Sequence, residues 1–126
     1  MDNRELGSRG EYLARLYLEE KGLVFIRANY RTARGEIDLI MQENDEIVFL
    51  EVKTRTVSSA RKYGRGAYRI DQEKQEAIFR AAMQFIREEP RLTKDLLPRF
   101  DAVEIYVDPQ EPEKVRVLYT PCAFGV

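Results

Sequence analysis

The sequence predicts an α/β domain in which helices flank a mixed β-sheet, and three observations carry this prediction. Apolar residues recur at helical spacing over residues 5–21 and again after residue 71. Between and after these stretches lie five short runs rich in β-branched and aromatic residues. The 126 residues are the usual size of one domain, and 44% of them are hydrophobic. We therefore expect a single domain over residues 1–126, with the order α-β-β-β-α-β-β.

The first helix is expected over residues 5–21 and ends at Gly22, a residue typical of helix termini. A helical projection puts Leu6, Gly7, Gly10, Leu13, Ala14, Tyr17 and Leu18 on one contiguous arc that should face the core. Glu11 lies at the margin of this arc. It is either an ordinary surface glutamate or a carboxylate that grazes the buried face.

Three strands are expected over residues 23–31, 36–41 and 46–53, and the polar residues 42–45 join the last two as a hairpin. If the turn centres on Asn44 and Asp45, Ile40 faces Phe49, Leu39 faces Leu50, Asp38 faces Glu51 and Ile37 faces Val52. One hairpin face is then wholly apolar: Ile37, Leu39, Met41, Val48, Leu50 and Val52. The other face carries Glu36, Asp38, Ile40, Phe49, Glu51 and Lys53.

The second half begins with a long segment, residues 54–69, that contains glycines and has no strong periodicity. Asp71 is a suitable N-cap for a helix that reaches Glu89 and stops at Pro90. Its inner stripe is Ala77, Ile78, Ala81, Ala82, Phe85 and Ile86, and Lys74 extends it. Strands follow at residues 100–107 and 115–119, with a turn over residues 109–114.

Composition excludes several classes of site. The chain has no His, which removes imidazole-based catalysis and His-ligated zinc. The 21 Lys and Arg residues balance 22 Asp and Glu residues, so any nucleic-acid surface must be a local patch. The lone Cys122 cannot form an internal disulfide, and no apolar run is long enough to span a membrane. We expect an unprocessed cytoplasmic protein that does not bind membranes.

Asp38 and Glu51 form the candidate site because two carboxylates facing each other on adjacent strands repel. A divalent cation would neutralise them, and Asp and Glu oxygens suit Mg²⁺ or Mn²⁺. Lys53, two residues from Glu51, could hold the attacking water or stabilise charge on a phosphate. The alternative is that Glu36 and Lys53 form a simple cross-strand ion pair, with both other carboxylates solvated on an exposed face.

Three segments resemble one known family: residues 35–40 (GEIDLI), 48–55 (VFLEVKTR) and 99–101 (RFD). They are similar to the YraN-type family of bacterial endonuclease-like proteins, which resembles the archaeal Holliday junction resolvases of the PD-(D/E)XK, restriction-endonuclease-like superfamily. An Asp followed 13 residues later by Glu-Val-Lys is specific within this element order. The departure is Ile37, which stands where the literal motif has Pro.

The resemblance implies a restriction-endonuclease-like sheet and a set of roles. Asp38 matches the metal-binding aspartate, Glu51 the second carboxylate, Lys53 the motif lysine and Glu11 the helix-one glutamate of the resolvase-like branch. The main-chain carbonyl of Val52 is expected to reach the metal. The implied activity is Mg²⁺- or Mn²⁺-dependent DNA cleavage, with branched DNA as substrate and a homodimer as the acting form.

Basic residues flank the candidate site in two segments that contain no acid. The expected phosphate contacts are Arg31, Arg34, Arg55, Arg61, Lys62, Arg65 and Arg69. Lys74 either covers the edge of the core with its stem or points toward the carboxylates, available to a phosphate. Two rival functions stay open: a non-catalytic nucleic-acid-binding module and a protein-protein adaptor.

Overall fold

The computed structural model describes residues 3–57 and 70–125. Its elements are α1 (Asn3–Glu20), β1 (Val24–Arg31), β2 (Glu36–Glu43), β3 (Glu46–Thr56), α2 (Gln72–Glu88), α3 (Pro90–Thr93), β4 (Leu97–Asp108) and β5 (Glu111–Phe124). Their order is the predicted one, with the one-turn helix α3 added. The sequence treated Pro90 as a stop, whereas here it opens a new turn, a position that suits its fixed φ.

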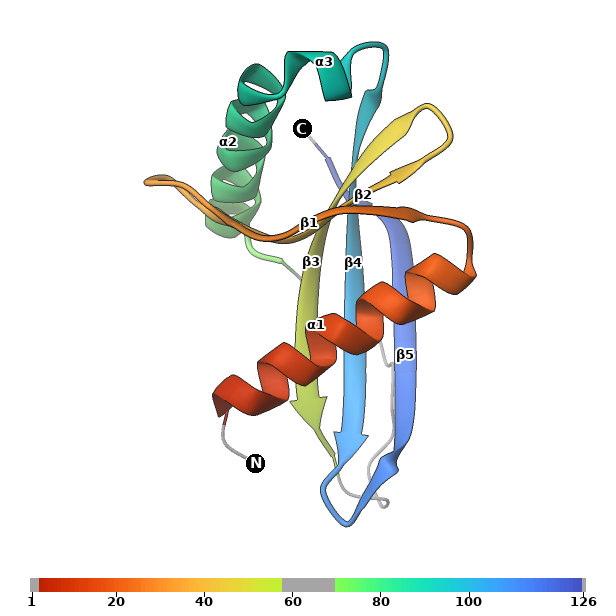
Figure 1. Ribbon diagram of the computed structural model, residues 1–126. Helices are drawn as coiled ribbons and strands as arrows, with labels where there is room; N and C mark the ends of the chain where they lie inside the picture. The colour runs from red at the N-terminus through yellow and green to blue at the C-terminus, as the bar shows by residue number, and fades with distance from the viewer. Residues whose placement is uncertain (1–2, 58–69, 126) are drawn as a thin grey trace.

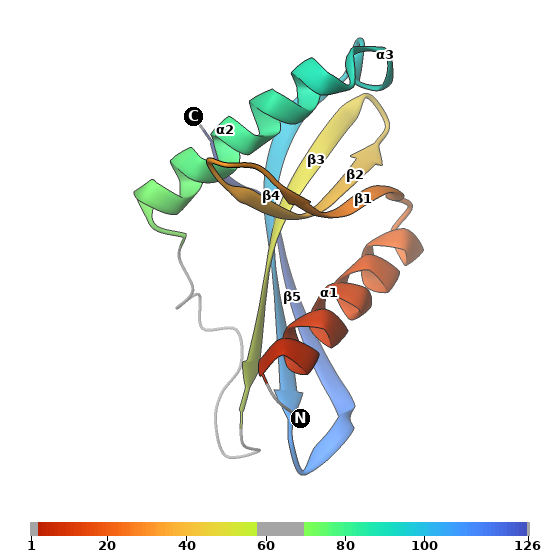
Figure 2. The same cartoon turned by 60° about the vertical axis from the view of Figure 1, so that its left-hand side comes forward.

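The five strands form one mixed sheet in the order β1-β2-β3-β4-β5. Neighbours are antiparallel except β3 and β4, which run parallel because α2 and α3 lie between them in the chain. Figures 1 and 2 show α1 and α2 on opposite sides of the sheet. This is the α/β arrangement that the sequence predicts, with a mixed sheet flanked by helices, and it is consistent with a restriction-endonuclease-like fold.

Each helix covers its own hydrophobic cluster. On the α1 side the buried residues are Ala14, Leu18, Leu23, Leu39, Met41, Val48, Leu50, Val52, Val103, Ile105 and Val107. On the α2 side they are Tyr30, Ile37, Ile40, Ile47, Phe49, Ile78, Ala81, Ala82, Phe85 and Phe100. The hairpin is therefore buried on both faces. Ile37 belongs to the α2-side cluster, so the sequence was wrong to place it beside Leu39.

The hairpin has the predicted register, but its ladder is shorter than expected. Ile40 pairs with Phe49 and Leu39 with Leu50, and the pairing of β2 with β3 ends at Leu39 and Leu50. Beyond these residues, Ile37 of β2 is still paired with β1, whereas Val52 of β3 is still paired with β4. Figure 1 shows the joined ends of β1 and β2 turning away from β3 toward the lower end of α2. This divergence also explains why Ile37 changes cluster.

The second helix begins as predicted. The Asp71 carboxylate accepts a hydrogen bond from the Lys74 backbone N–H at 2.8 Å, and Ile78, Ala81, Ala82 and Phe85 are buried.

The last strand is longer than expected, because its far end is tied to β4: the buried Asp101 accepts the backbone N–H of Cys122. Among the helices of residues 3–57 and 70–125, none is long and apolar enough to cross a membrane.

Candidate active site

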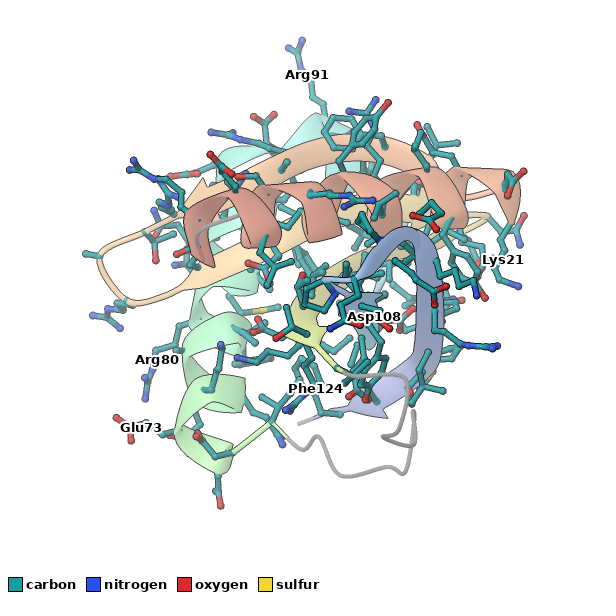
Figure 3. The ribbon with its side chains drawn as sticks, turned by 90° about the horizontal axis from the view of Figure 1, so that it is seen from below. Lys21, Glu73, Arg80, Arg91, Asp108 and Phe124 are labelled. Atoms are coloured by element: carbon teal, nitrogen blue, oxygen red, sulfur yellow. The ribbon has the colours of Figure 1, made fainter. Side chains whose placement is uncertain are left out.

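The predicted carboxylates meet where β2 leaves β3. Glu36 and Asp38 of β2, Glu51 of β3 and Lys74 of α2 line one pocket of about 190 Å³, with Ala77 and Ile78 beneath them. Figure 3 views the whole protein from below, with Glu73 and Arg80 marking α2. The pocket exists because the ladder between β2 and β3 stops, so that α2 closes one side of the opening.

Asp38 is held in place by the neighbouring strand. The Val52 N–H donates to its Oδ2 at 2.7 Å, so this carboxylate fills the position that a carbonyl of β2 would take in a continued ladder. Burial, and next the nearby charge of Glu51, raise the pKa of Asp38 to about 8, although the Val52 N–H opposes the shift. It is therefore unfavourable for Asp38 and Glu51 to be ionised at the same time in the metal-free protein.

Glu51 already has a positive partner. Its side chain is 5% exposed, and its Oε1 lies 2.6 Å from Nζ of Lys74, whose side chain is 50% exposed. The sequence left the direction of Lys74 open, and the structure places its ammonium in the pocket. A buried carboxylate is costly unless it is paired, so this contact stabilises the fold around Glu51.

Glu36 and Lys53 do not form the cross-strand ion pair of the simpler interpretation. Glu36 pairs instead with Arg31, its neighbour on β1, with a 3.5 Å contact between Oε1 and Nε. Lys53 is exposed, and its partner position in β4 is Glu104. Lys53 therefore stands two residues beyond Glu51 on β3, outside the group of residues that line the pocket.

Glu11 reaches the same charge cluster from α1, although α1 lies on the other side of the sheet. Burial raises its pKa, a hydrogen bond with the Asn29 side chain lowers it, and the charges of Glu36 and Glu51 raise it. Asn29, which the sequence did not single out, lies in β1 at a left-handed φ of 53°. Asn adopts this conformation more readily than most residues, so an Asn inside a run of strand-forming residues is the sequence signal that could have identified it.

Two glycines let the helices approach the pocket. A Cβ on Gly10 would lie 1.8 Å from Oγ1 of Thr54, so α1 packs on β3 only with Gly at this position. A Cβ on Gly35 would lie 2.4 Å from the Ala77 carbonyl oxygen. The turn between β1 and β2 therefore touches α2 beside the pocket.

The Arg-Phe-Asp segment serves a different part of the fold. The Arg99 guanidinium binds the Asp101 carboxylate at 2.9 Å, and it also binds Glu43 at 2.8 Å and Glu46 at 2.9 Å. Asp101 is fully buried and also accepts the Tyr119 hydroxyl. These bonds join the hairpin to β4 and β5 on the α1 side of the sheet, which is a structural role.

The basic residues expected at phosphates divide into three groups. Arg31, the last residue of β1, pairs with Glu36 of β2, and Arg34 lies in the exposed turn between the two strands. Arg55 points to the buried Glu104 of β4, with a 3.7 Å contact. Arg61, Lys62, Arg65 and Arg69 lie outside the described residues.

The pocket suits a hard divalent cation through a small set of oxygen ligands. Within the described ranges no group of three or more His, Cys, Asp or Glu side chains is arranged to hold a metal ion. Asp38 and Glu51 could supply two carboxylates, and Val52, the residue after Glu51, could supply a main-chain carbonyl. Mg²⁺ commonly binds through one or two carboxylates and completes its shell with water, so this donor set fits it.

Residues 10–105 match the profile described as "Uncharacterised protein family UPF0102". The chain belongs to this family. UPF0102 proteins of Caldanaerobacter subterraneus, Pasteurella multocida and Haemophilus influenzae are 36%, 39% and 38% identical to it. These matches cover 88%, 79% and 86% of the chain and 87%, 82% and 88% of the respective relatives. The family description names no activity.

Proposed function

We propose that this UPF0102 protein is a metal-dependent DNA endonuclease that hydrolyses phosphodiester bonds. The observation that supports the proposal most directly is the Asp38 and Glu51 pair, which faces one pocket beside a lysine at the point where two strands separate. A fold selected for stability alone would avoid a half-buried carboxylate next to a buried one. The pair is better explained as a site that binds a cation and a phosphate.

Each residue has a role in this proposal. Asp38, Glu51 and the Val52 carbonyl would hold Mg²⁺ or Mn²⁺, and the Val52 N–H keeps the Asp38 carboxylate in position. A bound divalent cation would supply positive charge for the scissile phosphate and lower the pKa of an attacking water. Lys53 would stabilise charge on the phosphate from the open side of β3. Glu11 would orient water from the α1 side of the cluster.

DNA would bind through its backbone. Arg31 and Arg34 extend from the pocket along the β1–β2 ribbon, and the side chain of Arg31 is 73% exposed. Arg55 carries the same sign of charge farther along β3. Contacts of this kind position a nucleic acid without reading its base sequence. Branched DNA and a homodimer belong to the proposal through the likeness to junction resolvases.

The decisive experiment is cleavage of labelled linear, flapped and four-way DNA by purified protein, with and without millimolar Mn²⁺. Asp38→Asn is the matched control, because it keeps the side chain's size and its hydrogen bond from Val52 but cannot ionise to bind a cation. We expect metal-dependent nicking by the parent protein and none by the variant. Salt-sensitive DNA binding without cleavage would indicate a non-catalytic nucleic-acid-binding module. No DNA binding at all would favour a protein-protein adaptor.

A further inference from the structure

Lys74 and Glu51 form an unequal ion pair. Glu51 is fixed by its place in the central strand and is almost completely buried, whereas the Lys74 side chain is half exposed. The Lys74 backbone is held by the Asp71 cap in the first turn of α2. The ammonium group, at the end of a flexible four-carbon stem, can therefore move without moving the helix.

The contact of 2.6 Å means that this ammonium occupies the space in front of Glu51 Oε1. A divalent cation bound by Glu51 would need a similar approach, because Mg²⁺ lies 2.0–2.1 Å from its oxygen ligands. Two cations at that distance from one oxygen would repel strongly in a partly buried pocket. The two cations would therefore compete for this oxygen atom.

We propose that Lys74 is a built-in counter-ion that holds the cation position of Glu51 in the metal-free protein and is exchanged for the divalent cation. The inference deepens the proposed function and rests on it. Glu36, Asp38 and Glu51 line the same pocket as Lys74, so the ammonium offsets part of a strong negative potential until the metal arrives. Metal binding therefore breaks the ion pair between Lys74 and Glu51. In the metal-free protein, Lys74 reduces the electrostatic repulsion among the carboxylates.

The exchange is tested by measuring the affinity of Mn²⁺ alone for the whole protein by titration calorimetry. Lys74→Met keeps the length of the stem and removes the competing charge, so we expect Mn²⁺ to bind on the order of fivefold more tightly. Arg80→Met is the matched control, since it removes a positive charge from an exposed ion pair on the same helix and lies outside the lining of the carboxylate pocket. It should leave the affinity within about twofold of the parent.

A second measurement uses the unaltered protein, in case Lys74→Met folds poorly. Lysine amines are acylated briefly with and without saturating Mn²⁺, and each site is quantified by mass spectrometry. Exchange should increase the labelling of Lys74 severalfold, while the exposed Lys94 stays constant.

The outcomes separate the two proposals. Mn²⁺ binding with unchanged Lys74 labelling, or an equal gain of affinity in Arg80→Met, would overturn the exchange and leave the nuclease proposal standing. If neither the parent nor Lys74→Met binds Mn²⁺, both proposals fail.

Discussion

Replacing Asp38 by Asn removes an ionisable carboxyl from the pocket and keeps a side-chain oxygen that can accept the Val52 N–H. The pKa of Asp38 is raised from 3.8 to about 8 in the folded protein, mainly by burial and next by Glu51. In the unfolded chain this carboxyl ionises near its ordinary value of about 4. Between these two values folding takes up a proton, so rising pH lowers the free energy of unfolding of the metal-free protein.

The magnitude follows from the slope of about 1.4 kcal/mol per pH unit for one proton. From about pH 5 to about pH 7 the parent should lose roughly 2–3 kcal/mol that Asp38→Asn does not lose. Urea unfolding in a chelating buffer measures this difference directly. Asp38→Ala is the control: it leaves the Val52 N–H without its acceptor and should be less stable by about 1–3 kcal/mol at both pH values. Parallel pH profiles for the parent and Asp38→Asn would show that the pKa of Asp38 is not raised on folding and would refute this reasoning.

Three further predictions concern the surroundings of the pocket. Gly35→Ala forces a Cβ against the Ala77 carbonyl, so it should cost about 1–3 kcal/mol in urea unfolding and reduce cleavage. Lys53→Met should lower single-turnover cleavage by about 100-fold while Mn²⁺ binding survives, and Lys53→Arg should rescue little of it; full activity in both variants would contradict its catalytic role. Neutralising Arg31 and Arg34 together should make the logarithmic salt dependence of DNA affinity shallower by roughly 2, and an unchanged slope would remove the β1–β2 ribbon from the binding surface.

The sequence by itself determined the local features. Periodicity predicted the two long helices and the five strands, and the polar residues around Asn44 predicted the hairpin and its register as far as Leu39. Asp71 was predicted as a cap because its side chain acts within its own helical turn. These features depend on contacts between residues close in the chain, and a sequence pattern reports such contacts well.

Only the tertiary structure decided how the site is assembled. Simple alternation put Lys53 beside Glu51, but the partner of Glu51 is Lys74, 23 residues away on α2. Alternation also failed for Ile37, because β2 leaves β3 after Leu39. Where a ladder ends, and which helix closes the opening, depends on packing between distant segments and on the competition of β1 and β4 for the two strands. No short sequence pattern encodes that balance.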